Sequence, residues 1–551
     1  MDNLSFESDN TAERLEPKLS KVVGIFLAQF DIKSGYKLVW SKSTQDNLNF
    51  NSLDYKVLPS GIHDTASSTI LISHRQNGKL YHGIARFQQR VLGGNNEANE
   101  LNEANEQLNR DNIKMYSLGI ICEPHQMSWK PNEYIQNGWE YIDILDSNLT
   151  KFLNDARFDD ISIFEDMFDK LTSSLFPSSP AAIENHLLNK MYDLFDILGP
   201  LVFVIYKECI LRKKIVFFNN TASNVDCYTV GAFTYLLSLL SMVPKDVEKV
   251  VKCEDFKVSS EPVYNIGLKD MNSELLQSSN WIGSTSDDIL MYHKDLFDVA
   301  VFLPSNVIEN TIILNSFDIG TISLDFNKRI KSTLKDYQKF KIIYRSLGSV
   351  CDSRRRNSSA DDIASIKTSN SLLSFFKTQD QISDLEPAWW LKSATSPISW
   401  REYIWSAFSW FASAGQVSDN NKIQNEESQP SLSGNSSNRF KLHQIIGIVG
   451  SFHKLTRKWF YLINEIITEK LDEQSSDSNT HEDFSDTESL LLRSLESNKI
   501  SIELTYQDII DMELDPYSEQ DLQFAKDFVK LYWDSVVDSV NIGLGIESIC
   551  C

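Results

Sequence analysis

The sequence predicts a mixed α/β protein with an antiparallel sheet, then a parallel sheet, then a helical C-terminal region. Short runs of β-branched and aromatic residues, separated by turn residues, fill the stretch from 22 to 122, and this pattern is typical of an antiparallel sheet. Between 181 and 345 strand-like runs alternate with helical runs, which predicts a parallel, doubly wound sheet. Beyond residue 397 the apolar residues recur at helical spacing, so helices should dominate there.

The first stretch is expected to hold five strands, at 22–31, 37–41, 70–74, 80–88 and 115–122. The segment 31–35, Asp-Ile-Lys-Ser-Gly, predicts a hairpin loop between the first two strands. Residues 93–112 repeat Asn-Glu-Ala-Asn without an apolar face, which predicts a solvated insertion. Between 133 and 175 apolar residues recur three and four positions apart. Helices should therefore cover one side of this sheet.

The second stretch is expected to begin with a helix that ends near 211. A strand at 214–218, a helix at 225–242 and strands at 262–267 and 299–303 follow. Further helical patterns occupy 397–414, 442–471 and 501–540. Polar stretches rich in Ser, Asp and Asn lie at 350–384, 415–440 and 472–489. Such stretches bury too little apolar surface to offset the entropy of ordering, so we expect disordered linkers there.

The composition excludes several classes of protein. With 53 Lys and Arg against 76 Asp and Glu, the net charge is −23, which argues against a nucleic-acid partner because phosphate binding needs a basic face. The seven cysteines are odd in number and lack zinc-type spacing, as expected for a reduced chain. The sequence contains neither a secretory apolar core nor an uncharged apolar run of membrane-spanning length. We expect a cytoplasmic protein, soluble or peripheral on membranes.

Motifs that carry chemistry are absent from the sequence. There is no phosphate-binding loop, no Gly-x-Gly-x-x-Gly, no His-Glu-x-x-His and no Gly-x-Ser-x-Gly, the patterns that would indicate nucleotide, zinc or acyl-transfer chemistry. We therefore expect no covalent catalysis, no cofactor and no metal site.

One aromatic cluster lies near the start of the C-terminal region. Five of the eleven tryptophans fall between 389 and 410, among them Trp400, Trp405 and Trp410. Around these three, a helix would be apolar on nearly every side, which favours a buried core helix. The alternative is a membrane-interface element, because indole rings prefer the headgroup level.

Two further features are candidate modification sites. Cys550 and Cys551 are adjacent at the end of the sequence; they are candidates for palmitoylation, resemble the double-cysteine end of membrane-attached small GTPases, or stay unmodified. Ser358 follows three arginines at 354–356, a context suited to phosphorylation by a basophilic kinase.

Seven segments follow one another along the chain: Val23 to Phe30 with Gly35 and Val39-Trp40, Tyr55 to His63, Gly83 to Phe87, Leu198 to Phe218, Asp298 to Phe302, Trp405 to Gly415 and Leu514 to Asp521. In this order they resemble the DENN-domain family, most closely its LCHN branch and the related fungal Avl9-and-Nprl-related proteins. The resemblance covers nearly the whole chain outside the linkers.

The resemblance implies three modules joined by linkers. Residues 21–176 correspond to a longin-like first module, which follows a disordered 1–20. Residues 181–346 correspond to a Rossmann-like central DENN module without a nucleotide loop. After the linker 350–384, residues 385–551 correspond to a helical C-terminal DENN-like module.

The resemblance also implies a function in membrane traffic. Many relatives are guanine-nucleotide exchange factors for Rab-type small GTPases, an activity that breaks no covalent bond. The partner would then be a small GTPase of the Rab type. The alternative is a non-catalytic DENN adaptor or effector tethered to a membrane or lipid-droplet surface.

Overall fold

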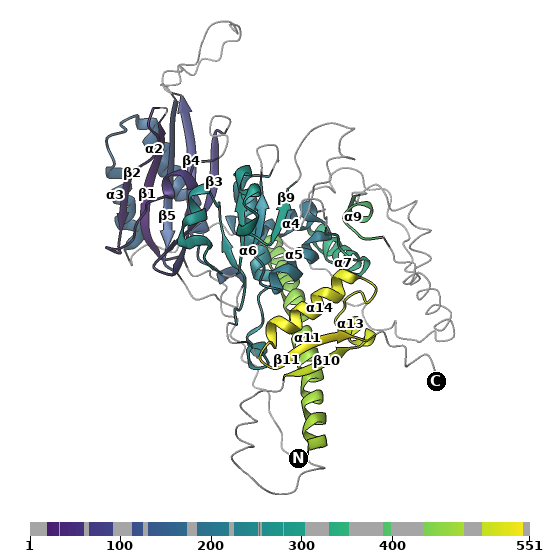
Figure 1. Cartoon of the computed structure of the whole chain (residues 1–551). Helices are drawn as coiled ribbons and strands as arrows, with labels where there is room; N and C mark the ends of the chain where they lie inside the picture. Colours follow the sequence, from purple (N-terminus) through teal and green to yellow (C-terminus); the bar gives the residue numbers. More distant parts are fainter. Residues whose placement is uncertain are drawn as a thin grey trace, which may run out of the picture. The chain divides into compact units, whose positions relative to one another are not determined.

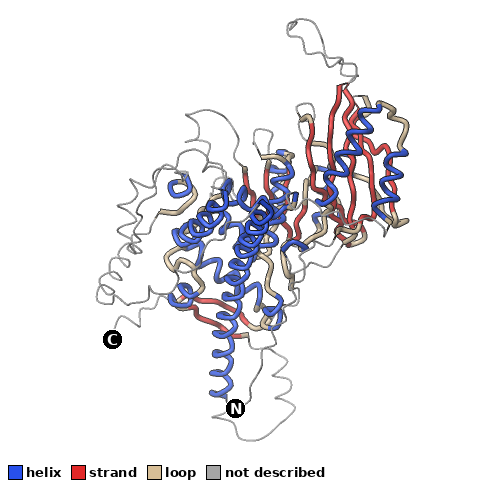
Figure 2. Tube along the Cα trace, turned by 180° about the vertical axis from the view of Figure 1, so that it is seen from behind, coloured by secondary structure: helices blue, strands red, loops and turns tan. Residues whose placement is uncertain are grey.

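The structure, a computed structural model of the chain, divides into two compact units. The first comprises Met1–Leu58 and His74–His186, and the second comprises Pro59–Ser73 and Leu187–Cys551. Figure 1 labels the elements, and Figure 2 distinguishes helices from strands. The structure describes residues 19–31, 33–59, 65–91, 113–124, 131–173, 185–219, 225–251, 253, 256–278, 280–303, 330–351, 389–397, 434–478 and 499–543.

A five-stranded sheet runs in the order β2-β1-β5-β4-β3, and its strands β1, β2, β4 and β5 lie in the first unit. The β1–β2, β1–β5 and β4–β5 pairs are antiparallel. This confirms the predicted antiparallel sheet, and all five expected runs fall within its strands. The strands are β1 (Val22–Asp31), β2 (Gly35–Ser43), β3 (Ser67–Gln76), β4 (Lys79–Val91) and β5 (Ile113–Cys122).

Helices α2 (Ile142–Asp155) and α3 (Ser162–Thr172) cover one face of this sheet, as predicted (Figure 1). Arg86 Nε of β4 lies 2.5 Å from Asp146 Oδ1 of α2, and the rings of Trp40 and Phe164 are 6.0 Å apart. The short helix α1 (Leu53–Lys56) contacts β1 and β2. The 3-10 helices η2 (Pro131–Glu133) and η3 (Trp139–Tyr141) precede α2.

A four-stranded parallel sheet, in the order β7-β8-β6-β9, is buried in the second unit. Its strands are β6 (Ile215–Phe218), β7 (Glu261–Val263), β8 (Trp281–Thr285) and β9 (Val299–Phe302). The parallel sheet was predicted, but β8 was not. Helix α6 (Cys227–Leu240) packs on β7 and β8. Among the described residues, the connections from β7 to β8 and from β8 to β9 are short 3-10 turns rather than the α-helices typical of a doubly wound sheet.

Further helices complete the second unit: α4 (Met191–Leu198), α5 (Leu201–Ile210), α7 (Leu334–Cys351), α9 (Trp389–Lys392) and the long α11 (Gly434–Ser478). The short helices η5 (Leu187–Lys190) and η6 (Lys245–Lys249) contact α11. Gly199 joins α4 to α5 at a φ of +56°, and a Cβ there would lie 2.5 Å from the buried Trp390. Trp390, a member of the aromatic cluster, is thus buried, whereas the predicted core helix at 397–414 lies almost entirely outside the described residues.

The C-terminal part of the second unit is not purely helical, contrary to the expected helical module. Strands β10 (Ile500–Leu504) and β11 (Val537–Ile542) form a parallel pair, and α13 (Tyr506–Asp511) and α14 (Glu519–Tyr532) lie between them in sequence. The reason is the two-residue alternation in β10, where Ile500, Ile502 and Leu504 are buried and the residues between them are exposed. That period belongs to a half-buried strand.

Helix α11 extends into both segments, 415–440 and 472–489, that were expected to be disordered, because it begins at Gly434 and ends at Ser478. Its middle carries a buried stripe from Ile445 to Ile467. A helix anchored in this way propagates into polar sequence at little cost, since each added residue gains a hydrogen bond without a new nucleation step.

Candidate functional site

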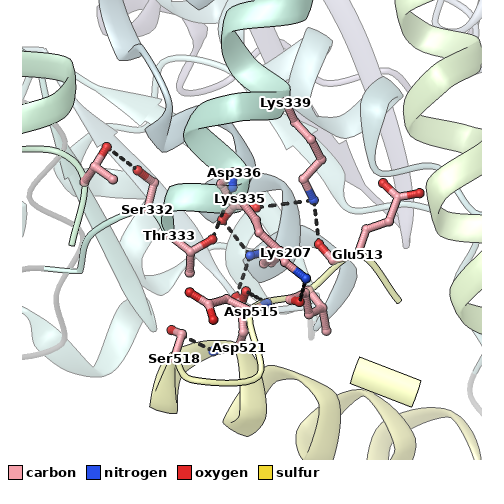
Figure 3. A network of polar contacts seen from close by, with 12 residues as sticks. Lys207, Ser332, Thr333, Lys335, Asp336, Lys339, Glu513, Asp515, Ser518 and Asp521 are labelled. Atoms are coloured by element: carbon pink, nitrogen blue, oxygen red, sulfur yellow. Dashed lines mark hydrogen bonds and ion pairs between the residues drawn. The ribbon is translucent and has the colours of Figure 1, made fainter. Parts of the chain in front are cut away.

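A buried ion cluster in the second unit joins three helices that are far apart in sequence. Lys207 of α5 places its Nζ 2.6 Å from Asp336 Oδ2 of α7 and 2.6 Å from Asp521 Oδ1 of α14 (Figure 3). Between 1 % and 7 % of these three side chains is exposed. Helix α5 is buried on nearly every side, so an ammonium group there needs partners inside the protein.

The positive charges of the lysines in the cluster offset the negative charges of its carboxylates. Burial opposes the charge on Lys207, but the two carboxylates overcome it and raise its pKa above the ordinary value. Burial also opposes ionisation of Asp336, yet Lys207 and Lys339 hold the pKa of this carboxyl below its usual range. Asp521 has its pKa raised by burial and by the nearby Asp336, against the opposing effect of Lys207. With Lys339 Nζ 3.5 Å from Asp336 Oδ1, the four groups carry no net charge when all are ionised.

Two lysines of α7 fix the turn between α13 and α14. Lys335 donates to the carbonyl oxygen of Leu514 at 2.8 Å, and Lys339 donates to that of Glu513 at 3.0 Å (Figure 3). The backbone N–H of Asp515 donates to Asp521 Oδ2 at 2.8 Å. The turn that precedes α14 is thus held by the same cluster that holds the helix.

Aromatic contacts around α5 extend this junction. Tyr206 shares a hydrogen bond of 2.5 Å with Thr456 of α11, and its ring centroid lies 5.5 Å from that of Trp459. Tyr532 of α14 donates to the carbonyl oxygen of Ile210 at 2.7 Å. The helices after residue 434 therefore share one core with α5 of the sheet region and do not form a separate lobe.

The carboxyl edge of the parallel sheet is where open α/β sheets usually bind ligands. Here the N-terminus of α6 is capped by a carboxylate, because Asp226 accepts from the N–H of Thr229 at 2.9 Å. A phosphate at this position would face that negative charge. The recess beside it, lined by Asn219, Tyr264 and Thr285 among others, has room for about one water molecule. As far as the structure describes it, this edge therefore does not suit a nucleotide.

The two connections at this edge expose apolar side chains. Leu268 lies on η7 (Leu268–Asn272), and Ile289 and Tyr292 lie on η9 (Asp288–Tyr292). The N–H of Leu268 donates to Asp287 Oδ2 at 3.3 Å, so the two turns run side by side. We call Leu268, Ile289 and Tyr292 the apolar rim. The turns η8 (Glu274–Leu276) and η10 (Lys294–Leu296) follow η7 and η9 respectively.

Acid–base and metal chemistry find little support in the parts of the chain that the structure describes. Within them, no group of three or more His, Cys, Asp or Glu side chains could hold a metal ion. Burial raises the pKa of the Cys227 thiol beside the recess to about 11, so it is a poor nucleophile at neutral pH. Over the same residues, none of the helices combines the length and apolarity needed to cross a bilayer.

The site residues predicted from sequence lie outside the described residues. This applies to Trp400, Trp405 and Trp410, to Ser358, and to Cys550 and Cys551. Sequence reasoning did not identify Lys207 or the apolar rim. A signal for Lys207 was present, since it interrupts an apolar run in the segment 198–218, but its partners are 129 and 314 residues away.

Comparison with protein families gives two matches. Residues 25–313, more than half of the chain, match the family described as DENN domain-containing protein 11. This range includes the four-stranded sheet and the five-stranded sheet apart from the start of β1. Residues 395–550 match a domain of unknown function, DUF4484. The second match includes α11, α14 and the β10–β11 pair, which share a core with α5 of the first match.

Three curated proteins are similar to this chain. Uncharacterized protein ANR2 of Saccharomyces cerevisiae is 21 % identical over 554 residues, which cover 96 % of this chain and 94 % of that protein. Uncharacterized protein C119.16c of Schizosaccharomyces pombe is 23 % identical, over 59 % of this chain and 72 % of that protein. DENN domain-containing protein 11 of Danio rerio is 21 % identical, over 51 % of this chain and 53 % of that protein.

Proposed function

Because this chain belongs to the DENN domain-containing protein 11 family, we propose that it is a guanine-nucleotide exchange factor for a Rab-type small GTPase in membrane traffic. The family match over 25–313 carries the proposal, since DENN-domain proteins generally act as exchange factors for Rab GTPases. The family identified from sequence is confirmed; the exchange activity is our inference for this chain.

An exchange factor needs no reactive group of its own. It binds the nucleotide-free GTPase more tightly than the GDP-bound form and so shifts the population toward nucleotide release. Such binding energy comes from surfaces held in a fixed shape, because a surface that must be ordered on binding loses affinity to that ordering. Rigid surfaces of this kind are provided by α5, α7 and α14, which the buried ion cluster joins, and by η7 and η9, which a hydrogen bond joins at the sheet edge.

We assign the modules of this exchange factor as the resemblance implies. Residues 21–176 serve as the longin-like module, 181–346 as the Rossmann-like central module and 385–551 as the C-terminal module. The antiparallel sheet, the parallel sheet and the α11–α14 region support this assignment in turn. The buried ion cluster at Lys207 contacts Asp336 of the central module and Asp521 of the C-terminal module, which supports the view that these two modules act as one body.

The test is GDP release from a panel of purified Rab GTPases that carry a fluorescent GDP. We expect the full chain to accelerate release from at least one of them in proportion to its concentration. A Rab treated with EDTA gives the maximum rate for comparison. If the chain accelerates release from none of the panel, the proposal is wrong.

Affinity for the different nucleotide states separates an exchange factor from an effector. An exchange factor binds the nucleotide-free GTPase most tightly, whereas an effector prefers the GTP-bound form. We expect pull-downs of the full chain to favour the nucleotide-free GTPase by tenfold or more, on the order of 1.4 kcal/mol.

The second candidate is a non-catalytic adaptor or effector on a membrane or lipid-droplet surface. The adjacent Cys550 and Cys551 and the tryptophans at 400, 405 and 410 favour it, since two membrane signals together anchor a protein where one is marginal. Replacement of both cysteines by serine should release the protein from membranes in cells. An unchanged location would contradict the lipidation part of this candidate.

A further inference from the structure

The apolar rim is unusual because its side chains are solvent-exposed although its backbone is firmly held. Leu268 is 38 % exposed, Ile289 is 53 % exposed and Tyr292 is 80 % exposed. Single exposed apolar residues are common on protein surfaces, but here three lie on two turns that a hydrogen bond joins, a placement that suits an interaction site. Tyrosine is also enriched among the residues that dominate binding energy.

The turns that carry the rim are fixed by hydrogen bonds and by a buried anchor. Thr285 donates to the carbonyl oxygen of Ile266 at 2.7 Å and accepts from the N–H of Asp287 at 3.0 Å. Leu290 is buried between Ile289 and Tyr292 in sequence, so η9 buries one apolar side chain and turns two others outward. The exposed side chains therefore need little ordering when a partner binds.

The charge around the rim restricts the kind of partner. Residues 268–297 contain five acidic residues against the two basic residues Lys269 and Lys294. Asp270 is buried, and the other four acids, Glu274, Asp287, Asp288 and Asp295, are exposed or half-buried. Nucleic acid and anionic lipid would be repelled. A second copy would bring the same acidic surface against itself across a two-fold axis. The recess is too small for a small-molecule ligand.

We propose that the carboxyl edge of the four-stranded sheet is part of the surface that binds the small GTPase, with Leu268, Ile289 and Tyr292 as its apolar contacts. This inference rests on the proposed function. The partner surface presents apolar side chains flanked by Lys or Arg, which the acidic turns attract.

The test compares the double variant Ile289→Ser/Tyr292→Ala with a matched control, Ile342→Ser/Tyr461→Ala. The control removes exposed side chains of the same types from α7 and α11 of the same unit, where Ile342 is 72 % and Tyr461 is 43 % exposed. We expect kcat/KM for GDP release to fall about tenfold or more in the rim variant, as for hot-spot residues, and to stay within about twofold in the control.

A charge variant tests the electrostatic part. Asp288→Lys should slow association with the GTPase, and the difference from the unmodified chain should shrink as salt is raised from 50 to 500 mM, because screening weakens steering. Circular dichroism and thermal melting of each variant check the fold. If the double variant fails to fold, the single variant Tyr292→Ala decides, because its side chain is the most exposed of the three.

The outcomes separate this inference from the proposed function. If the unmodified chain releases GDP from no GTPase, the proposed function fails and this inference fails with it. If the unmodified chain is active and the folded rim variant equals the control, only this inference is overturned. If sedimentation shows that the rim variant turns a dimer into a monomer while exchange is unchanged, the rim binds a second copy and the inference is again overturned.

Discussion

Replacement of Lys207 by methionine should destabilise the second unit far more than the loss of an ordinary ion pair. Lys207→Met keeps the length and apolar stem of the side chain but removes both contacts of 2.6 Å. Asp336 and Asp521 then remain inside the protein with 1 % and 3 % of their side chains exposed. Removal of one partner from a buried ion pair costs about 3–5 kcal/mol, because the remaining charge is uncompensated.

The measurement is urea unfolding followed by tryptophan fluorescence. Four buried tryptophans of the second unit, Trp281, Trp390, Trp459 and Trp533, make this signal sensitive to the region around α5. The matched control is Lys458→Met, which removes a pair of 3.1 Å to Glu513 whose side chains are 45 % and 46 % exposed. An exposed pair contributes less than about 1 kcal/mol. If Lys207→Met costs no more than this control, the reasoning from burial is refuted.

A second change and a second pH test the cause of the destabilisation. Adding Asp521→Asn to Lys207→Met removes one of the two buried charges and should recover at least about 1 kcal/mol. Burial raises the pKa of Asp521 in the folded state, and Lys207 opposes this effect, so its loss should raise that pKa further above the unfolded value. The destabilisation is therefore present at pH 7.5 and should diminish toward pH 5 as Asp521 takes up a proton. A loss that is the same at both pH values would indicate a packing defect instead.

Three further predictions concern single sites. Burial, with a smaller effect of a nearby arginine, lowers the pKa of His453 below 6.5. The stability that the neutral imidazole contributes is therefore present above pH 6.5 and lost as the pH falls below it. His453→Gln should make the urea midpoint fall less between pH 7.5 and pH 5. Gly199→Ala should lower the free energy of unfolding by about 2 kcal/mol or more, because φ is +56° and the new Cβ would lie 2.5 Å from an indole carbon of Trp390. The control Gly447→Ala, whose Cβ would have no atom within 4 Å, should stabilise α11 by about 0.5–1 kcal/mol. Equal urea midpoints for the two variants would contradict this prediction. The side-chain and backbone hydrogen bonds from Ser34 lower the pKa of Asp31 to about 2. Ser34→Ala removes only the hydroxyl's bond, so NMR titration should show a pKa between this value and the ordinary 3.8.

The elements that the sequence predicted well are those with long local patterns. The five strands of the first sheet have β-branched runs bounded by turn residues, and each was found within a few residues of its ends. β8 was missed because Trp281–Thr285 is short and lies among polar turns. β10 was missed because five alternating residues are easily merged with the helical pattern of α13 and α14.

The candidate site was not predictable in the same way, because its groups meet only in the folded chain. A lysine in an apolar helix indicates a buried partner, but nothing near position 207 names Asp336 or Asp521. The apolar rim gives no pattern at all, since Ile289 and Leu290 are adjacent and similar, and only folding decides which of them is buried. The prediction of an exchange factor came from the resemblance to a family, because local patterns such as these do not indicate that function.

The shared charge of Lys207, Asp336 and Asp521 also constrains how such chains diverge. A relative that loses the lysine alone keeps two buried carboxylates without their shared cation, and one that loses a single aspartate leaves an excess of positive charge in the core. Substitutions at these three positions should therefore be correlated, with uncharged residues replacing all three together. We therefore expect an alignment of relatives to show covariation between the DENN region and the domain that follows it.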